Sequence, residues 1–233
     1  MVSNSPPEII LALDVESRSK AMSILKVTGE QLKWVKVGLQ SYLRDGPELL
    51  SEIAGMGKRI FLDLKLHDIP NTMSKALESL SSLPIDMLTV HATAGPEAMS
   101  KCSREAKAIM PEVTLLAVTV LTSMDKASLS AIGVDSPVEE QVIKLATLAS
   151  ESGIGGVVCS PLELEILRPT LPQETKLVTP GIRPSGSDQG DQKRIMTPSQ
   201  AHQAGADYLV IGRPILAASE PSDALAKIIG EME

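Results

Sequence analysis

The chain has 233 residues, 43% of them hydrophobic, which suffices for one large domain with a sizeable core. Its formal net charge of −7 argues against a general nucleic-acid or anionic-membrane surface, although a few local cations can still hold a small anionic ligand. One Trp, two Tyr and one Phe are the only aromatic residues, so we expect no stacking platform for bases.

Eight short apolar runs predict eight strands, and helix-compatible segments lie between them. We expect strands at residues 9–13, 34–37, 60–64, 87–90, 113–120, 156–158, 176–179 and 208–211. We expect helices at residues 18–27, 40–54, 72–81, 96–108, 137–151, 162–167, 198–203 and 222–229. Prolines near three of the helix starts and glycines near four of the helix ends agree with these bounds.

This alternation predicts an α/β fold, a single (β/α)8 barrel. The nearly continuous apolar strands fit a sheet that is covered on both faces. An open, doubly wound sheet is the alternative, but Leu13-Asp14-Val15-Glu16 stands where a glycine-rich dinucleotide fingerprint would follow the first strand. Since no long polar linker divides the chain, we expect one catalytic domain spanning residues 1–233.

Cysteine usage and the absence of targeting signals predict a cytoplasmic protein. Cys102 and Cys159 show neither metal-ligand spacing nor a disulfide pattern, so we expect two reduced thiols. No segment approaches the roughly 20 apolar residues of a membrane span. The first residues lack the basic and apolar regions of a signal peptide.

Two predicted loops, at residues 121–134 and 181–194, are longer than a barrel needs. Both follow strands on the side where barrel enzymes carry their active sites. The second loop is rich in Gly, Ser, Asp and Gln, which favours a ligand lid over a spacer.

The segment 61–70, Phe-Leu-Asp-Leu-Lys-Leu-His-Asp-Ile-Pro, carries the strongest sign of chemistry. Because side chains alternate along a strand, Asp63 and Lys65 are expected on one face. Taken alone, Lys36 fits a lysine that extends to solvent along an apolar face about as well as a functional lysine. In a barrel, however, its strand neighbours the third strand, so Lys36 can meet Asp63 and Lys65. An alternating, locally neutral array of Lys36, Asp63, Lys65 and Asp68 can then form. Lysines held charged by carboxylates donate protons, which indicates proton delivery to a carbanion-like centre.

The loops after the seventh and eighth strands predict a phosphate site, as is common in such barrels. They read Pro180-Gly181-Ile182-Arg183 and Ile211-Gly212-Arg213-Pro214. Glycine lets backbone amides approach an anion, and arginine offers a bidentate fork. Arg213 follows a buried strand directly, which favours a functional role, whereas a solvated loop charge remains the alternative for Arg183. By chemistry alone, Gln192 is an ordinary surface glutamine.

Two histidines near these charges raise the question of a metal. Asp63, His67 and Asp68 together could hold a divalent ion. However, Lys65 lies among them and would repel a cation, and His67 is expected on the opposite face from Asp68. We therefore expect structural hydrogen bonds for His67 and His91 and no metal.

With these residues in place, the sequence resembles the orotidine 5′-phosphate decarboxylase family over essentially its whole length. The resemblance rests on Leu13-Asp14, Lys36-Val37-Gly38, residues 63–72, residues 179–184, residues 191–194 and residues 212–215. The Asp-x-Lys-x-x-Asp element is shared with related barrel enzymes that act on sugar phosphates, such as hexulose-phosphate synthases. The His-Asp-Ile-Pro-Asn-Thr extension and the two arginine loops make the resemblance specific.

The resemblance implies decarboxylation of orotidine 5′-monophosphate to UMP and CO2 in pyrimidine biosynthesis, with neither cofactor nor metal. It implies that Lys65 donates a proton to C6 of the pyrimidine, with Asp63 near the departing carboxylate and Lys36 contacting the ribose. Leu66 stands where the family usually has an aromatic residue, at a position expected to face away from the site.

The resemblance also implies a homodimer whose shared active site includes Asp68 and Thr72. The further substrate contacts that it implies are Asp14 with the ribose hydroxyls, Thr122 with the pyrimidine edge, and Arg183, Gln192, Gly212 and Arg213 with the phosphate, Gln192 bridging toward the base.

Two alternative functions are disfavoured by particular residues of the sequence. A metal-dependent aldolase or decarboxylase of a sugar phosphate is disfavoured by Thr122 together with Gln192. An inactive nucleotide-binding sensor on the same barrel is disfavoured by the complete charged array, because a sensor needs no proton donor.

Overall fold

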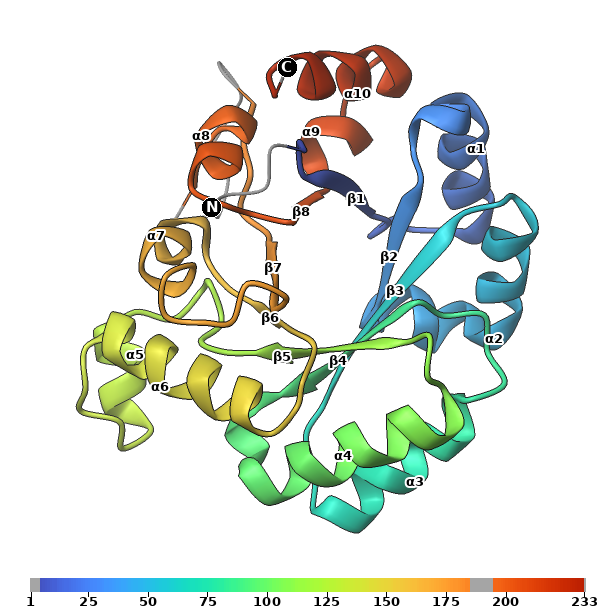
Figure 1. Cartoon of the computed structure of the whole chain (residues 1–233). Helices are drawn as coiled ribbons and strands as arrows, with labels where there is room; N and C mark the ends of the chain where they lie inside the picture. Colours follow the sequence, from blue (N-terminus) through green and yellow to red (C-terminus); the bar gives the residue numbers. More distant parts are fainter. Residues whose placement is uncertain (1–4, 185–194, 233) are drawn as a thin grey trace.

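Eight parallel strands close into a barrel in chain order, with β8 returning to pair with β1 (Figure 1). The structure is a computed structural model that describes residues 5–184 and 195–232. The strands are β1 (Glu8–Ala12), β2 (Trp34–Gly38), β3 (Arg59–Leu66), β4 (Met87–His91), β5 (Thr114–Val118), β6 (Gly156–Val158), β7 (Lys176–Thr179) and β8 (Tyr208–Ile211). The barrel confirms the predicted (β/α)8 fold and excludes the open sheet.

Helices surround the barrel and connect successive strands (Figure 1). Their bounds are α1 (Arg18–Thr28), α2 (Leu39–Gly55), α3 (Pro70–Leu80), α4 (Pro96–Ile109), α5 (Lys126–Ala131), α6 (Val138–Glu151), α7 (Leu164–Leu167), α8 (Pro198–Gln203), α9 (Arg213–Leu216) and α10 (Pro221–Gly230). Short 3-10 turns lie at Gly29–Gln31, Ala92–Ala94 and Pro161–Glu163. Capping side chains mark several starts: Ser17 accepts a hydrogen bond from the Lys20 amide before α1, and Thr197 and Gln200 form a capping box at α8.

The elements differ from the sequence prediction at four places. The predicted loop 121–134 contains α5, and Arg213 opens α9; both helices are too short to show an amphipathic period. The predicted helix 162–167 is a 3-10 turn followed by α7. Inside α2, Gly46 has a φ of 66° before Pro47, so that helix is kinked, as proline inside a helix requires.

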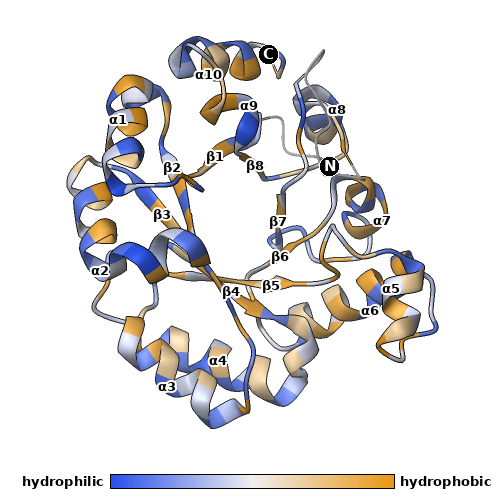
Figure 2. Cartoon of the chain, turned by 180° about the vertical axis from the view of Figure 1, so that it is seen from behind, coloured by the Kyte–Doolittle hydropathy of each residue, from blue (hydrophilic) through white to orange (hydrophobic). Residues whose placement is uncertain are grey.

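The apolar residues form two layers, one inside the barrel and one between strands and helices. The inner cluster consists of Ile10, Ala12, Trp34, Phe61, Met87, Leu116, Val178 and Val210. In Figure 2, β4 and β5 are largely hydrophobic, whereas the surrounding helices carry both hydrophobic and hydrophilic residues. Strands that are buried on both faces explain the nearly continuous apolar runs in the sequence.

Trp34 closes the amino-terminal end of the barrel. Its indole N–H donates to Oε2 of Glu8 at 3.2 Å, and the Arg59 guanidinium lies 4.1 Å from its ring centroid. The ring of Tyr208 contacts it edge-on, with the centroids 5.4 Å apart. With this end filled by side chains, the opposite end is left for a site.

Cys102 and Cys159 are buried free thiols, and burial raises the pKa of Cys102 to about 11, which leaves it unreactive. Within residues 5–184 and 195–232, no helix combines the length and the apolar character needed to cross a membrane.

Candidate active site

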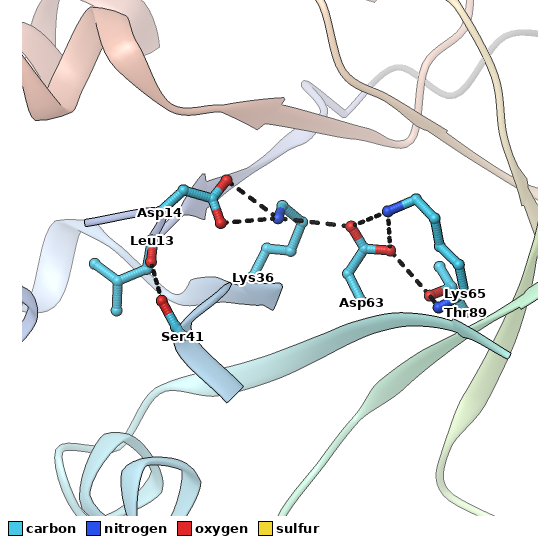
Figure 3. Close-up of polar contacts among 7 residues, drawn as sticks. All are labelled: Leu13, Asp14, Lys36, Ser41, Asp63, Lys65 and Thr89. Carbon is cyan, nitrogen blue, oxygen red and sulfur yellow. Dashed lines mark hydrogen bonds and ion pairs between the residues drawn. The ribbon is translucent and has the colours of Figure 1, made fainter. Parts of the chain in front are cut away.

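Four charged side chains form a continuous chain of ion pairs at the carboxyl ends of the first three strands (Figure 3). Nζ of Lys36 lies 3.4 Å from Oδ2 of Asp14 and 3.6 Å from Oδ2 of Asp63. Nζ of Lys65 donates to both carboxylate oxygens of Asp63, each at 2.8 Å. Two anions and two cations alternate, so the group as a whole is neutral and its burial is tolerable.

This arrangement decides between the two interpretations of Lys36. Its side chain is only 12% exposed and lies between the carboxylates of Asp14 and Asp63. A lysine that extends to solvent along an apolar face is therefore excluded. The pairing of β2 with β3, with Gly38 opposite Asp63, brings Lys36 to the charges of β3.

The expected membership of the array needs one correction. Asp68 lies beyond the end of β3, on the exposed connection to α3, where its carboxylate accepts a hydrogen bond from the Ile69 amide at 2.7 Å. Within one chain the second anion of the array is Asp14 instead. Thr72 is likewise exposed, at the first turn of α3.

Lys65 has the backbone geometry of a constrained position. Its φ of 52° makes it the only non-glycine residue with a positive φ in the described part of the chain. The pairing of β3 with β4 shifts here, since Leu62 pairs with Leu88 but Leu66 pairs with Val90. Such a conformation costs of order 1–3 kcal/mol and persists only where its surroundings enforce it. Leu66 packs against the outer core, so it faces away from the site as expected.

The residue that sequence reasoning missed is Thr89 in β4. Its hydroxyl accepts a hydrogen bond from the Lys65 amide at 2.8 Å and donates one to Oδ1 of Asp63 at 2.9 Å. The side chain is completely buried. The available signal was a hydroxyl residue in the apolar run 87–90, but nothing in the sequence says that β4 places it against Asp63.

Smaller contacts hold the first two members of the array. Ser41 of α2 donates from Oγ to the carbonyl oxygen of Leu13 at 3.0 Å, which fixes the backbone beside Asp14 (Figure 3). At Gly38, a Cβ atom would lie 3.0 Å from Nζ of Lys36 and 3.1 Å from Oδ1 of Asp14. Glycine therefore leaves the space in which this ion pair forms.

Asp63 is held in its ionised form. Burial by itself raises the pKa of this carboxyl, but the charges of Lys36 and Lys65, with hydrogen bonds from Lys65 and Thr89, outweigh burial and lower it below its usual value. The array thus presents a buried carboxylate that orients the ammonium group of Lys65 from two oxygens.

A pocket of about 410 Å³ lies between Asp14 and Lys36 of the array and the two arginine loops. It is lined by Ala12, Asp14, Lys36, Pro180, Gly181, Arg183, Val210, Gly212, Arg213 and Leu216. Arg183 is buried, and its Nη1 donates to the carbonyl oxygen of Ile182 at 2.9 Å, so it is not a solvated loop charge. Arg213 is exposed at the start of α9. An anion at these arginines would lie in the same pocket as Asp14 and Lys36.

Three expected substrate contacts, Asp63, Thr72 and Thr122, do not line this pocket. Thr122 lines a second, smaller pocket of about 210 Å³ beside α5 and α6. Gln192 lies outside the described residues, as does most of the predicted lid 181–194. The two flanks of that segment are joined, because the Arg183 amide donates to the Met196 carbonyl at 2.9 Å.

The two histidines interact with each other and with a threonine. The rings of His67 and His91 stack with centroids 5.3 Å apart, and Nδ1 of His91 lies 2.7 Å from Oγ1 of Thr93. Burial lowers the pKa of His91, and the nearby positive charges of His67 and Lys65 lower it further. In the ranges that the structure describes, no group of three or more His, Cys, Asp or Glu side chains is arranged to hold a metal ion.

Comparison with known proteins gives a consistent result. The model of the orotidine 5′-phosphate decarboxylase / HUMPS family matches residues 7–228. A protein of Opitutus terrae named orotidine 5′-phosphate decarboxylase is 46% identical over 226 residues, covering 97% of this chain and 98% of the relative. One of the same name from Pseudoalteromonas translucida is 47% identical over 227 residues, covering 97% of each chain.

Solved structures agree with these sequence matches. The crystal structure of orotidine 5′-phosphate decarboxylase from Lactobacillus acidophilus superimposes with a TM-score of 0.86 at 36% identity, covering 98% of this chain and all of that one. An uncharacterized conserved protein from Geobacillus kaustophilus superimposes with a TM-score of 0.85 at 32% identity, covering 97% of this chain and all of that one.

Proposed function

The chain belongs to the orotidine 5′-phosphate decarboxylase / HUMPS family, and on this premise we propose that it converts orotidine 5′-monophosphate to UMP and CO2 in pyrimidine biosynthesis. The observation that carries the proposal is the ion-pair chain, whose members Asp14 and Lys36 line the same pocket as Arg183 and Arg213. The substrate carries a pyrimidine carboxylate at one end and a phosphate at the other. A proton donor, Lys65, and a phosphate-binding pair of arginines match these two ends.

The reaction breaks the bond between C6 of the pyrimidine and its carboxyl carbon. CO2 leaves, and the electron pair stays on C6, where the ring stabilises it poorly. The ammonium group of Lys65 stabilises this charge and then transfers a proton from Nζ to C6, which forms UMP. Lys65 recovers its proton from solvent, to which its side chain is partly exposed. This chemistry uses neither a cofactor nor a metal.

The carboxylate of Asp63 has two roles in this proposal. It orients Nζ of Lys65 through two hydrogen bonds of 2.8 Å. Beside the departing carboxylate of the substrate, its charge disfavours the bound substrate more than the CO2-like transition state. Lys36 balances the charge of Asp63 and, with Asp14, contacts the ribose.

The phosphate group does not react, but its binding supports the chemistry. We assign it to Arg183, Gly212 and Arg213, which line the pocket. The family resemblance adds a contact of Gln192 with phosphate and base to this proposal. Binding energy from this remote group can be used to orient the pyrimidine at the charged array.

The test is the spectrophotometric consumption of orotidine 5′-monophosphate by the purified protein, with and without EDTA. We expect stoichiometric formation of UMP at the same rate in both samples. Loss of activity in EDTA that magnesium restores would favour the sugar-phosphate relatives of the family. UMP binding without any turnover would favour a nucleotide sensor.

We further propose that the protein acts as a homodimer in which Asp68 and Thr72 complete the active site of the partner subunit. Exposed apolar side chains at the starts of α2 and before α3 support this proposal: Leu39 is 48% exposed, Leu43 78% and Ile69 67%. These residues follow β2 and β3, the strands that carry the charged array. Burying them would place Asp68 at a subunit interface.

Mixed dimers test this sharing. Lys65→Ala and Asp68→Ala should each be inactive as pure proteins. If the site is shared, a mixed dimer has one site with both residues intact, so random mixing should restore roughly one quarter of wild-type activity. Mixed protein as inactive as its parents, or a fully active Asp68→Ala variant, would refute the shared site. Size-exclusion chromatography of each sample establishes that dimers formed.

A further inference from the structure

We propose that Thr89 is a positioning residue that holds the carboxylate of Asp63 and the backbone of Lys65 in one fixed arrangement. This inference rests on the proposed role of Lys65 as proton donor and adds a residue to those assigned above. Thr89 does not line the pocket, and its two hydrogen bonds go to Asp63 and Lys65, through which it would act.

The chemistry of the partners determines both hydrogen bonds of Thr89. A backbone amide can only donate, so the hydroxyl accepts from the Lys65 N–H at 2.8 Å. An ionised carboxylate can only accept, so the single hydroxyl proton points to Oδ1 of Asp63 at 2.9 Å. The buried hydroxyl of Thr89 thus both accepts and donates a hydrogen bond, and its two partners are nearby residues of the site.

The local strand geometry explains why a side chain is needed here. Between the pairs Leu62–Leu88 and Leu66–Val90, β3 has three residues where β4 has only one, which is Thr89. Backbone pairing cannot satisfy the Lys65 amide across this irregularity, and the amide bonds instead to the Thr89 hydroxyl. The same bond holds Lys65 in its positive-φ conformation.

Removal of the Thr89 hydroxyl should therefore displace Nζ of Lys65, the nitrogen that donates the proton. Oδ1 of Asp63 accepts from Thr89 and also from Nζ of Lys65 at 2.8 Å. Without Thr89, the carboxylate can rotate and the backbone of Lys65 can relax, so Nζ moves relative to C6. Displacements of about 1 Å at a reacting group can cost about 100-fold in rate.

The experiment compares Thr89→Val with Thr89→Ser in the full-length protein. Valine keeps the shape of threonine and removes the hydroxyl, whereas serine keeps the hydroxyl. We expect Thr89→Val to lower kcat by about 10- to 100-fold with KM changed by less than about threefold, and Thr89→Ser to restore most of kcat. Amide hydrogen exchange at Lys65, followed by NMR, should accelerate in the valine variant alone.

Thr28→Val is the matched control. Thr28 is likewise buried and donates from Oγ1 to the Ile24 carbonyl at 3.0 Å, but this hydrogen bond lies within α1 and involves no member of the array. Its substitution removes a buried hydroxyl of the same kind and should leave kcat unchanged. If Thr89→Val does not fold, Thr89→Ala replaces it in the same comparison.

The outcomes of these measurements separate a failure of the role of Thr89 from a failure of the proposed function. Unchanged kcat and unchanged exchange at Lys65 in Thr89→Val would overturn the role of Thr89. A fall in kcat that Thr89→Ser does not restore, or that Thr28→Val reproduces, would mean that Thr89 only contributes to packing. That result would also overturn the proposed positioning role. Wild-type protein without turnover of orotidine 5′-monophosphate would instead refute the proposed function, while the exchange measurement would still test the Thr89 contacts.

Discussion

Replacing Lys65 with alanine is expected to lower kcat for orotidine 5′-monophosphate by at least about 1,000-fold. The variant lacks the ammonium that is proposed to face C6, and among the described residues no other cation holds both carboxylate oxygens of Asp63 at 2.8 Å. The affinity for UMP should change by no more than about threefold, because UMP carries no carboxylate at C6 and keeps its ribose and phosphate contacts. Steady-state kinetics and calorimetric titration with UMP measure the two effects.

Two further variants make this result specific. Lys75→Ala removes an exposed lysine of α3 that pairs with Glu78 at 2.6 Å, and it should leave kcat unchanged. Lys65→Arg keeps a positive charge at the array, but a guanidinium does not release its proton in proteins. We expect the arginine variant to be inactive too. Near-wild-type turnover in Lys65→Ala would refute the assignment of Lys65.

Replacing Arg213 with alanine is expected to weaken UMP binding by about 10- to 100-fold and to leave uridine binding unchanged. The range follows from about 1.5–3 kcal/mol for a hydrogen bond to a charged group. Arg213 opens α9 beside the pocket that Asp14 and Lys36 also line. Comparing the two ligands isolates the phosphate, since they differ in nothing else. Calorimetric titration of both ligands gives the measurement.

Arg104→Ala serves as the control for this variant. Arg104 is an exposed arginine of α4, and its removal changes the net charge of the protein by the same amount. It should alter the affinity for neither ligand. Equal loss of UMP and uridine affinity in Arg213→Ala would show that Arg213 supports the pocket as a whole, and unchanged affinity for both would remove it from the phosphate site.

The fold and part of the site could be predicted because they depend on local pattern. Strand alternation placed Asp63 and Lys65 on one face, and the ion pair between them agrees. The order of strands in a barrel made β2 and β3 neighbours, so Lys36 was expected beside Asp63, as it is found. The loops after β7 and β8 both line one pocket, as the arginines in them suggested.

Other features of the site were not accessible to this reasoning. Asp68 follows Lys65 by three residues, yet the chain leaves β3 at Leu66 and carries Asp68 out to solvent. Regular alternation also gives no hint that Lys65 adopts a positive φ. That conformation depends on the mismatch with β4, and therefore on contacts between strands rather than along one.

Composition and periodicity thus predict a parallel barrel with charged strand ends, because burial on two faces leaves a direct trace in the order of apolar residues, and the structure shows that the barrel is closed. Three-dimensional packing establishes which charges meet within one chain: Asp14, and not Asp68 of the same chain, pairs with Lys36, and Thr89 joins the array from another strand. The physical reason is the short range of the interactions that hold the site together. A hydrogen bond or ion pair needs its atoms within a few ångströms, and residues 14, 36, 63 and 89 reach that distance only after the first four strands have paired.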